Sequence, residues 1–239
     1  MIVKPTLGGR GVITDVTTES VTNPVLQLPP PTGANAPVKN DLLLAFIYAR
    51  STSFPITAQG SGWTKEEAIG SIGCRFELWW RYATASEPST HNFLMTGTPD
   101  SNNAGFQGYI QRVQLAHLKN DPIGFWAENT GQDGNLGWTV NGGSTPEELW
   151  IRGFMYCFSD LNPFGFPAGL DISEFNPEGQ GAWGVDWDSI FDYYTTTVPS
   201  TVVISGEVDI GSNDYWAAGH FTIRPRPDDA NQIMFGCNF

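Results

Sequence analysis

Acidic side chains beside tryptophan are the first candidates for chemistry in this sequence. Glu77 and Trp79 lie two residues apart in an aromatic stretch, residues 75–83, so on a β-strand they would share one face. A carboxyl group beside an indole could take part in sugar cleavage, which requires two carboxyl groups about 5–10 Å apart. A solvated or edge-strand glutamate explains the same residue without any activity. We favour this second interpretation and expect no catalytic residue.

Two adjacent acidic pairs are weaker candidates for such a site. They are Glu66–Glu67 and Glu147–Glu148. Neighbouring residues on a strand point to opposite faces of the sheet. One member of each pair should therefore point away from any cleft that the other lines.

An acidic segment near residue 190 resembles part of a calcium-binding loop. Asp186 and Asp188 occupy its first and third positions. Residues 190, 191 and 197, however, are not the oxygen donor, glycine and glutamate that an EF-hand requires at positions five, six and twelve. We expect instead a short helix over residues 189–194, with Asp186 or Asp188 at its N-cap.

No other pattern of reactive side chains is complete. The three histidines are scattered at His91, His117 and His220, and no GxSxG elbow, P-loop or dinucleotide fingerprint occurs. The three cysteines show neither CxxC nor zinc-ligand spacing. The sequence therefore predicts no metal and no cofactor.

Composition excludes several classes of partner. The 239 residues carry 25 Asp and Glu against 12 Lys and Arg, a net charge of −13, which disfavours nucleic acid and anionic membranes. The longest apolar run, residues 42–49, is too short to span a bilayer. No secretory signal is recognisable, and an odd number of cysteines is not a disulfide framework. We expect reduced thiols and assembly in a bacterial cytoplasm.

Strand signals dominate the chain. Stretches rich in β-branched and aromatic residues recur between turn residues at 11–22, 24–28, 41–50, 75–83, 90–95, 105–118, 148–158, 201–210 and 215–223. About nine such strands predict an all-β fold, a single two-sheet antiparallel sandwich of jelly-roll-like type. The run at 41–50 is apolar at nearly every position, which is typical of a strand buried on both faces.

The sandwich domain is expected to span residues 12–227. An N-terminal arm, residues 1–11, and a C-terminal tail, residues 228–239, lack its alternating pattern, and the glycines at 8–11 predict a turn. Within the domain, residues 160–200 form a long insertion loop with little regular structure. It is rich in aromatic side chains: Phe164, Phe166, Phe175, Trp183, Trp187, Tyr193 and Tyr194. These pack on their own sandwich, contact another subunit, or form a stacking platform for a glycan.

Several short motifs occur in a characteristic order along the chain. They are DLLLAF at 41–46, SGWT at 61–64, ATASEP at 83–88, DPI at 121–123, and a final strand that starts near Trp216 and ends in RP at 224–225. This order resembles a family of β-sandwich domains in phage and prophage virion proteins. Its motifs are structural: Trp63 covers a sheet end after a glycine turn, Trp79 lies in the strand before the corner, and Pro88 ends that corner.

The resemblance implies a non-enzymatic structural protein of a bacteriophage virion. It would serve as capsid decoration or cement, or as a tail-fibre or tail-tip component, and act by multivalent assembly. Its partners would be other virion proteins and further copies of itself, with a trimer as one possible form. The alternative is a carbohydrate-binding module for host recognition on a tail fibre. A polysaccharide-degrading enzyme using Glu77 is the third interpretation.

Overall fold

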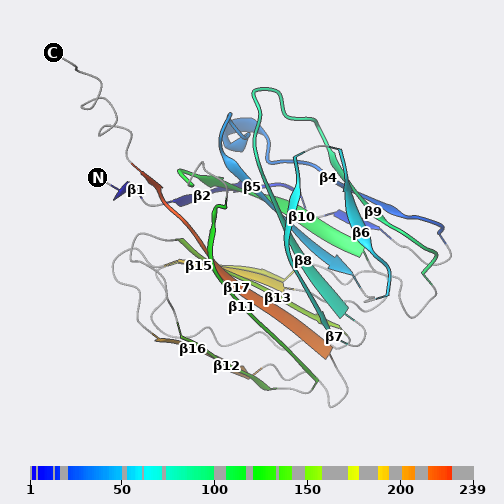
Figure 1. The fold of residues 1–239 in the computed structure, drawn as a ribbon, viewed down its shortest axis with the longest axis vertical. Helices are drawn as coiled ribbons and strands as arrows, with labels where there is room; N and C mark the ends of the chain where they lie inside the picture. The colour runs from blue at the N-terminus through cyan, green and yellow to red at the C-terminus, as the bar shows by residue number, and fades with distance from the viewer. Residues whose placement is uncertain are drawn as a thin grey trace.

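Antiparallel strands make up almost all of the regular structure in this chain (Figure 1). The structure, a computed structural model, describes residues 2–3, 5–12, 14–16, 21–49, 53–60, 62–71, 74–99, 106–116, 121–132, 135–141, 149–157, 172–177, 188–193, 201–207 and 215–227. Among these residues the only helix is η1 (Gly33–Asn35), a single 3-10 turn. No helix in this part of the chain is long and apolar enough to cross a membrane.

A six-stranded sheet lies at the centre of the fold. Its strand order is β2-β10-β5-β8-β7, and β3 also pairs with β10. The strands are β2 (Thr6–Arg10), β3 (Thr14–Val16), β5 (Leu42–Ala49), β7 (Thr64–Ser71), β8 (Cys74–Tyr82) and β10 (Phe106–Gln114). The central strand β5 is buried at every position, which confirms the expectation drawn from its apolar run.

One face of this sheet packs against a three-stranded sheet of order β4-β9-β6. Its strands are β4 (Val25–Leu28), β9 (His91–Met95) and β6 (Ile56–Gln59). Leu43, Ala45 and Ile47 of β5 point to this side and pack with Phe93 and Met95 of β9. Successive residues of a strand face opposite ways, so the odd-numbered residues of β5 serve this layer.

The other face of the central sheet packs against a second three-stranded sheet, of order β11-β17-β13. Its strands are β11 (Ile123–Gln132), β17 (Tyr215–Ile223) and β13 (Leu149–Cys157). Leu44 and Phe46 of β5 meet Ile123, Phe221 and Ile223 here. The predicted all-β antiparallel sandwich is confirmed. The central sheet has a three-stranded sheet packed on each of its two faces.

Three pairs of short strands complete the fold. They are β1 (Ile2–Val3) with β18 (Arg226–Pro227), β12 (Asn135–Asn141) with β16 (Thr201–Glu207), and β14 (Ile172–Pro177) with β15 (Asp188–Tyr193). The first pair joins segments from near the two ends of the chain, beside β2 in Figure 1.

The short helix expected at 189–194 is wrong, because residues 188–193 form β15. Ile190, Phe191 and Tyr193 are strand-forming types, and one and a half helical turns have too few hydrogen bonds to offset nucleation. The insertion at 160–200 thus contains a pair of strands, where we expected little regular structure.

The turn expected at the glycines 8–11 is also wrong. Residues 6–10 form β2 and pair with β10, so this part of the expected N-terminal arm belongs to the central sheet. Glycine carries no side chain, so it leaves no alternating pattern to read. The tail at 228–239 lies outside the described residues.

Candidate functional site

Glu77 is the centre of a buried ionic cluster on β8. Its side chain is fully buried, on the same face of the strand as Trp79, whose Nε1 donates to Glu77 Oε2 at 2.8 Å. Oε1 lies 2.8 Å from Arg75 Nε and 3.5 Å from Lys65 Nζ. The predicted shared face of Glu77 and Trp79 is therefore confirmed.

The electrostatics of this cluster are those of an enclosed carboxylate. Burial raises the pKa of Glu77, while the Arg75 and Lys65 charges and the Trp79 hydrogen bond oppose that rise. Lys65 also covers the Trp79 ring, with Nζ 5.3 Å from the ring centroid. Both carboxylate oxygens thus face groups that hold them in place.

Glu66, one of the other glutamates considered from the sequence, forms its hydrogen bond on the opposite side of the central sheet, whereas Glu147 and Glu148 lie outside the described residues. Glu66 Oε2 accepts from Trp80 Nε1 at 2.9 Å. Trp80 packs on the core that faces β11, β17 and β13, whereas Trp79 packs on the opposite core. Glu66 and Glu77 therefore do not face one another across a common cleft, as two glycosidase carboxyl groups must.

A second cluster joins the two most specific motifs of the sequence. Trp63 follows Gly62, whose φ of +95° favours glycine. Its indole Nε1 donates to His91 Nδ1 at 3.3 Å. The ring meets His91 and Phe93 edge-on, with centroids 5.2 and 5.4 Å apart, and Arg81 lies 5.9 Å above it.

Glu87 ties the ATASEP corner to the same cluster. Its Oε1 accepts from both the backbone N and the hydroxyl of Thr84, and from Arg81 Nη2 at 3.4 Å. Its Oε2 lies 3.3 Å from His91 Nε2. Pro88, the next residue, is exposed at the corner. We call Trp63, Arg81, Thr84, Glu87 and His91 the motif corner.

The hydrogen bonds of the motif corner define the state of His91. Because Trp63 donates to Nδ1, that nitrogen is unprotonated, and Nε2 carries the proton toward Glu87. Burial, with Arg81 nearby, lowers the pKa of His91 to about 4, although Glu87 opposes the shift. A carboxylate–imidazole pair of this kind can serve a catalytic base. Here the indole occupies the nitrogen that would take a proton from a nucleophile.

The sequence did not single out this cluster. The motifs predict structural roles for Trp63 and Pro88, whereas His91 is one of three scattered histidines. The 28-residue separation of Trp63 from His91 carries no local signal. Only the four-residue step from Glu87 to His91 could have hinted at their pairing.

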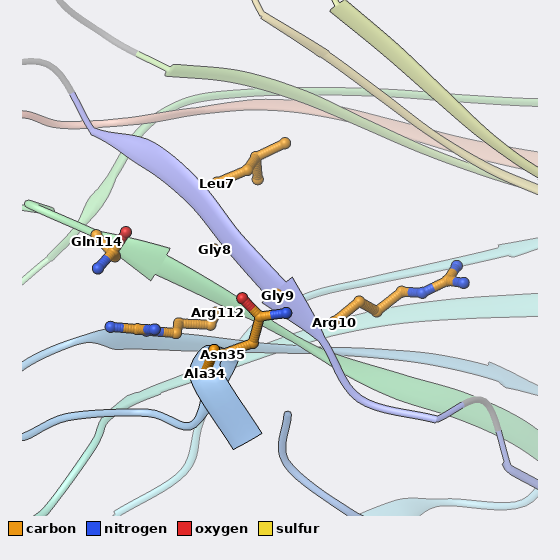
Figure 2. Close-up of a pocket in the computed structure, with 8 residues that line it drawn as sticks. All are labelled: Leu7, Gly8, Gly9, Arg10, Ala34, Asn35, Arg112 and Gln114. Carbon is orange, nitrogen blue, oxygen red and sulfur yellow. The ribbon is translucent and has the colours of Figure 1, made fainter. Parts of the chain in front are cut away.

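A polar pocket lies where β2, β10 and η1 meet (Figure 2). It has a volume of about 620 Å³ and is open to solvent. Its lining consists of Leu7, Gly8, Gly9, Arg10, Ala34, Asn35, Arg112 and Gln114. At its base Arg112 is buried, and its Nε donates to Asp41 Oδ2, which also accepts from the backbone N of Val38 at 2.8 Å.

The expected aromatic platform is placed only in part. Phe175 lies on β14 opposite Ile190, and Tyr193 lies on β15 opposite Ile172. Trp216, which belongs to the structural motifs and not to the platform, lies on β17, opposite Gly131 and Tyr156 of its two neighbouring strands. Five aromatic positions of the insertion lie outside the described residues: Phe164, Phe166, Trp183, Trp187 and Tyr194.

Within the described part of the chain, no three His, Cys, Asp or Glu side chains gather in a way that could hold a metal ion. No protein-family model, curated protein or solved structure matches this chain.

Proposed function

We propose that this protein is a structural, non-enzymatic component of a bacteriophage virion, either capsid decoration or cement or part of a tail fibre or tail tip. Its partners would be other virion proteins and further copies of itself. Each contact would be modest, and repetition around the particle would supply the strength.

The observation that carries this proposal is the motif corner. The SGWT and ATASEP motifs, with 18 residues between them, meet there through Trp63, Arg81, Thr84 and Glu87. Their polar groups contact one another and His91, so the contacts support an architectural role for the motifs. That is the role they have in the virion domains that this sequence resembles.

The pairing of β1 with β18 supports attachment through the chain ends. It holds Ile2 opposite Pro227, so both terminal segments start from one edge of the sandwich. Contacts made there would leave the two cores of the sandwich undisturbed. Residues 228–239 follow directly on β18 and include the apolar run Ile233, Met234 and Phe235.

Quantitative mass spectrometry of purified particles tests the proposal. Copies per major capsid protein would be counted in particles from the bacterium that produces this chain. Hundreds of copies would indicate the capsid lattice, and a few to a few dozen would indicate the tail. Absence from the particles would overturn the proposal.

Deletion of residues 228–239 tests the role of the tail. We expect weaker incorporation into particles with an unchanged melting temperature, because the last described strand, β18, ends at Pro227. Deletion of Ile2 and Val3 is the companion variant, since it removes the partner of β18. Normal incorporation of the tail deletion would rule out attachment through that segment.

A further inference from the structure

The pocket between β2, β10 and η1 presents three planar polar groups. These are the amides of Asn35 and Gln114 and the guanidinium of Arg112 (Figure 2). Asn35 is exposed, Gln114 half-buried and Arg112 buried, so the groups lie at different depths. Each amide offers both a donor and an acceptor, and the guanidinium offers a fork of donors.

Asp41 and Gln111 hold Arg112 and its backbone in place. Arg112 Nε donates to Asp41, and the two side chains are only 8% and 6% exposed. Gln111 secures the neighbouring backbone, because its Nε2 donates to Gly8 O and to Arg112 O, each at 2.9 Å. The base of the pocket is thus held rigid before any ligand arrives, which lowers the entropic cost of binding.

Two glycines leave room for these groups. A Cβ at Gly8 would lie 2.9 Å from both Cγ and Cδ of Arg112. A Cβ at Gly9 would lie 2.2 Å from Cβ of Asn35. Any other residue at these positions would displace Arg112 or Asn35, so the glycines of β2 preserve the shape of the pocket.

The charge balance of the pocket favours a neutral ligand. The Arg112 charge is compensated by Asp41. Arg10 contributes to the lining, but its side chain extends away from Arg112 in Figure 2 and covers the Tyr109 ring at 5.4 Å. Because Arg112 is paired with Asp41, Arg10 extends away from Arg112, and the whole chain has a net charge of −13, an anionic ligand gains little here.

The chemistry of the lining favours hydroxyl groups over apolar ones. Among the described residues that line the pocket, Leu7 and Ala34 are the only ones with apolar side chains, so an apolar peptide side chain would bury little apolar surface there. A sugar ring carries adjacent hydroxyls, each both donor and acceptor, which match the amides and the guanidinium. The volume of about 620 Å³ falls within the range of about 300–1,000 Å³ for small-ligand sites.

We propose that this pocket binds one unit of a neutral saccharide through Asn35, Gln114 and Arg112. The described residues that line it lie outside the insertion at 160–200, and the proposal does not depend on the virion role. On a virion it would contact host glycan.

Saturation-transfer NMR on the full chain tests the assignment. The neutral probes are the methyl glycosides of glucose, galactose, mannose, rhamnose, N-acetylglucosamine and N-acetylgalactosamine. Methyl glucuronoside and N-acetylneuraminic acid are the acidic probes. We expect at least one neutral glycoside to bind, and the acidic ones to bind more weakly.

Two double variants locate the binding. Asn35→Ala with Gln114→Ala removes both pocket amides, and should lower the affinity roughly tenfold, since each lost hydrogen bond is worth a few-fold. Gln27→Ala with Gln59→Ala removes two exposed amides from β4 and β6, away from the pocket lining, and should leave binding unchanged. Circular dichroism melts verify that both variants fold.

The proposal fails if no neutral glycoside binds to the wild-type chain. It fails equally if binding survives the loss of Asn35 and Gln114 undiminished, or if only the acidic probes bind. None of these results bears on the copy number in particles, so this test and that of the virion role fail independently.

Discussion

Acidification is expected to destabilise this protein through His91. The side chain is 4% exposed, its Nδ1 accepts the Trp63 indole proton, and burial lowers its pKa from 6.5 to about 4. The unfolded chain therefore protonates this imidazole near pH 6.5, whereas the folded chain does not protonate it until the pH falls to about 4. Stability from this group is fully present above pH 6.5 and is lost as the pH falls toward 4.

The size of this effect follows from the two pKa values. A fall from 6.5 to about 4 is about 2.5 pKa units. At 1.36 kcal/mol per unit, this corresponds to about 3 kcal/mol of the free energy of unfolding. The steepest contribution of one proton is about 1.4 kcal/mol per pH unit. Such a loss is a large part of the stability of an ordinary domain.

Chemical denaturation at a series of pH values measures this contribution. Wild type and His91→Gln are unfolded in urea between about pH 4 and pH 7.5, and the two free energies are subtracted. The subtraction cancels the carboxyl groups that titrate in both proteins. We expect the advantage of the wild type to shrink by about 3 kcal/mol as the pH falls. Parallel curves for the two proteins would refute the reasoning.

Nitrogen-15 NMR of the imidazoles gives an independent readout. The resonance that disappears in His91→Gln should titrate near pH 4 and report a proton on Nε2. Glu87 raises the pKa of His91, so Glu87→Gln should move the midpoint lower still. A midpoint near the ordinary value of 6.5 would contradict the burial of His91 in the folded chain.

Three further substitutions test other parts of the structure. Glu77→Gln should show the opposite pH dependence. Burial raises the pKa of Glu77, so its contribution to stability is fully present below the ordinary value of 4.5 and is lost as the pH rises. Urea unfolding should therefore find that the stability of the wild type falls relative to the variant as the pH rises above 4.5. Phe46→Ala, at a fully buried ring stacked 5.1 Å from Tyr109, should cost about 3–5 kcal/mol, whereas the control Val38→Ala, at a 57% exposed site, should stay within about 0.5 kcal/mol by the same assay. Gly108→Ala should lower the melting temperature and cost about 1–3 kcal/mol, because its Cβ would lie 2.5 Å from the carbonyl oxygen of Phe46; an unchanged melt would mean that the two strands can separate at no cost.

Local patterns were sufficient to predict the class of the fold and the character of its central strand. The apolar run of β5 predicted burial on both faces, and its alternate residues do serve two cores. The two-residue step from Glu77 to Trp79 predicted a shared face, which their hydrogen bond confirms. These inferences succeed because the alternation of side chains is a property of the extended backbone itself.

The same reasoning failed where a local pattern was weak. Residues 6–10 contain two glycines and residues 188–193 are few, so neither segment shows the alternation of a strand. Both are nevertheless strands, because β10 and β14 provide pairing partners. Tertiary context overrides weak intrinsic preference in such segments.

From the sequence alone one can infer an antiparallel β-sandwich, an acidic chain, and structural motifs around Trp63 and Pro88. The tertiary structure decided which polar groups meet: His91 lies between Trp63 and Glu87, Glu66 and Glu77 are on opposite sides of one sheet, and Arg112 lies under the glycines of β2. The physical reason is the range of each interaction. Alternation is set residue by residue, whereas these contacts join segments that only chain folding and strand register bring together.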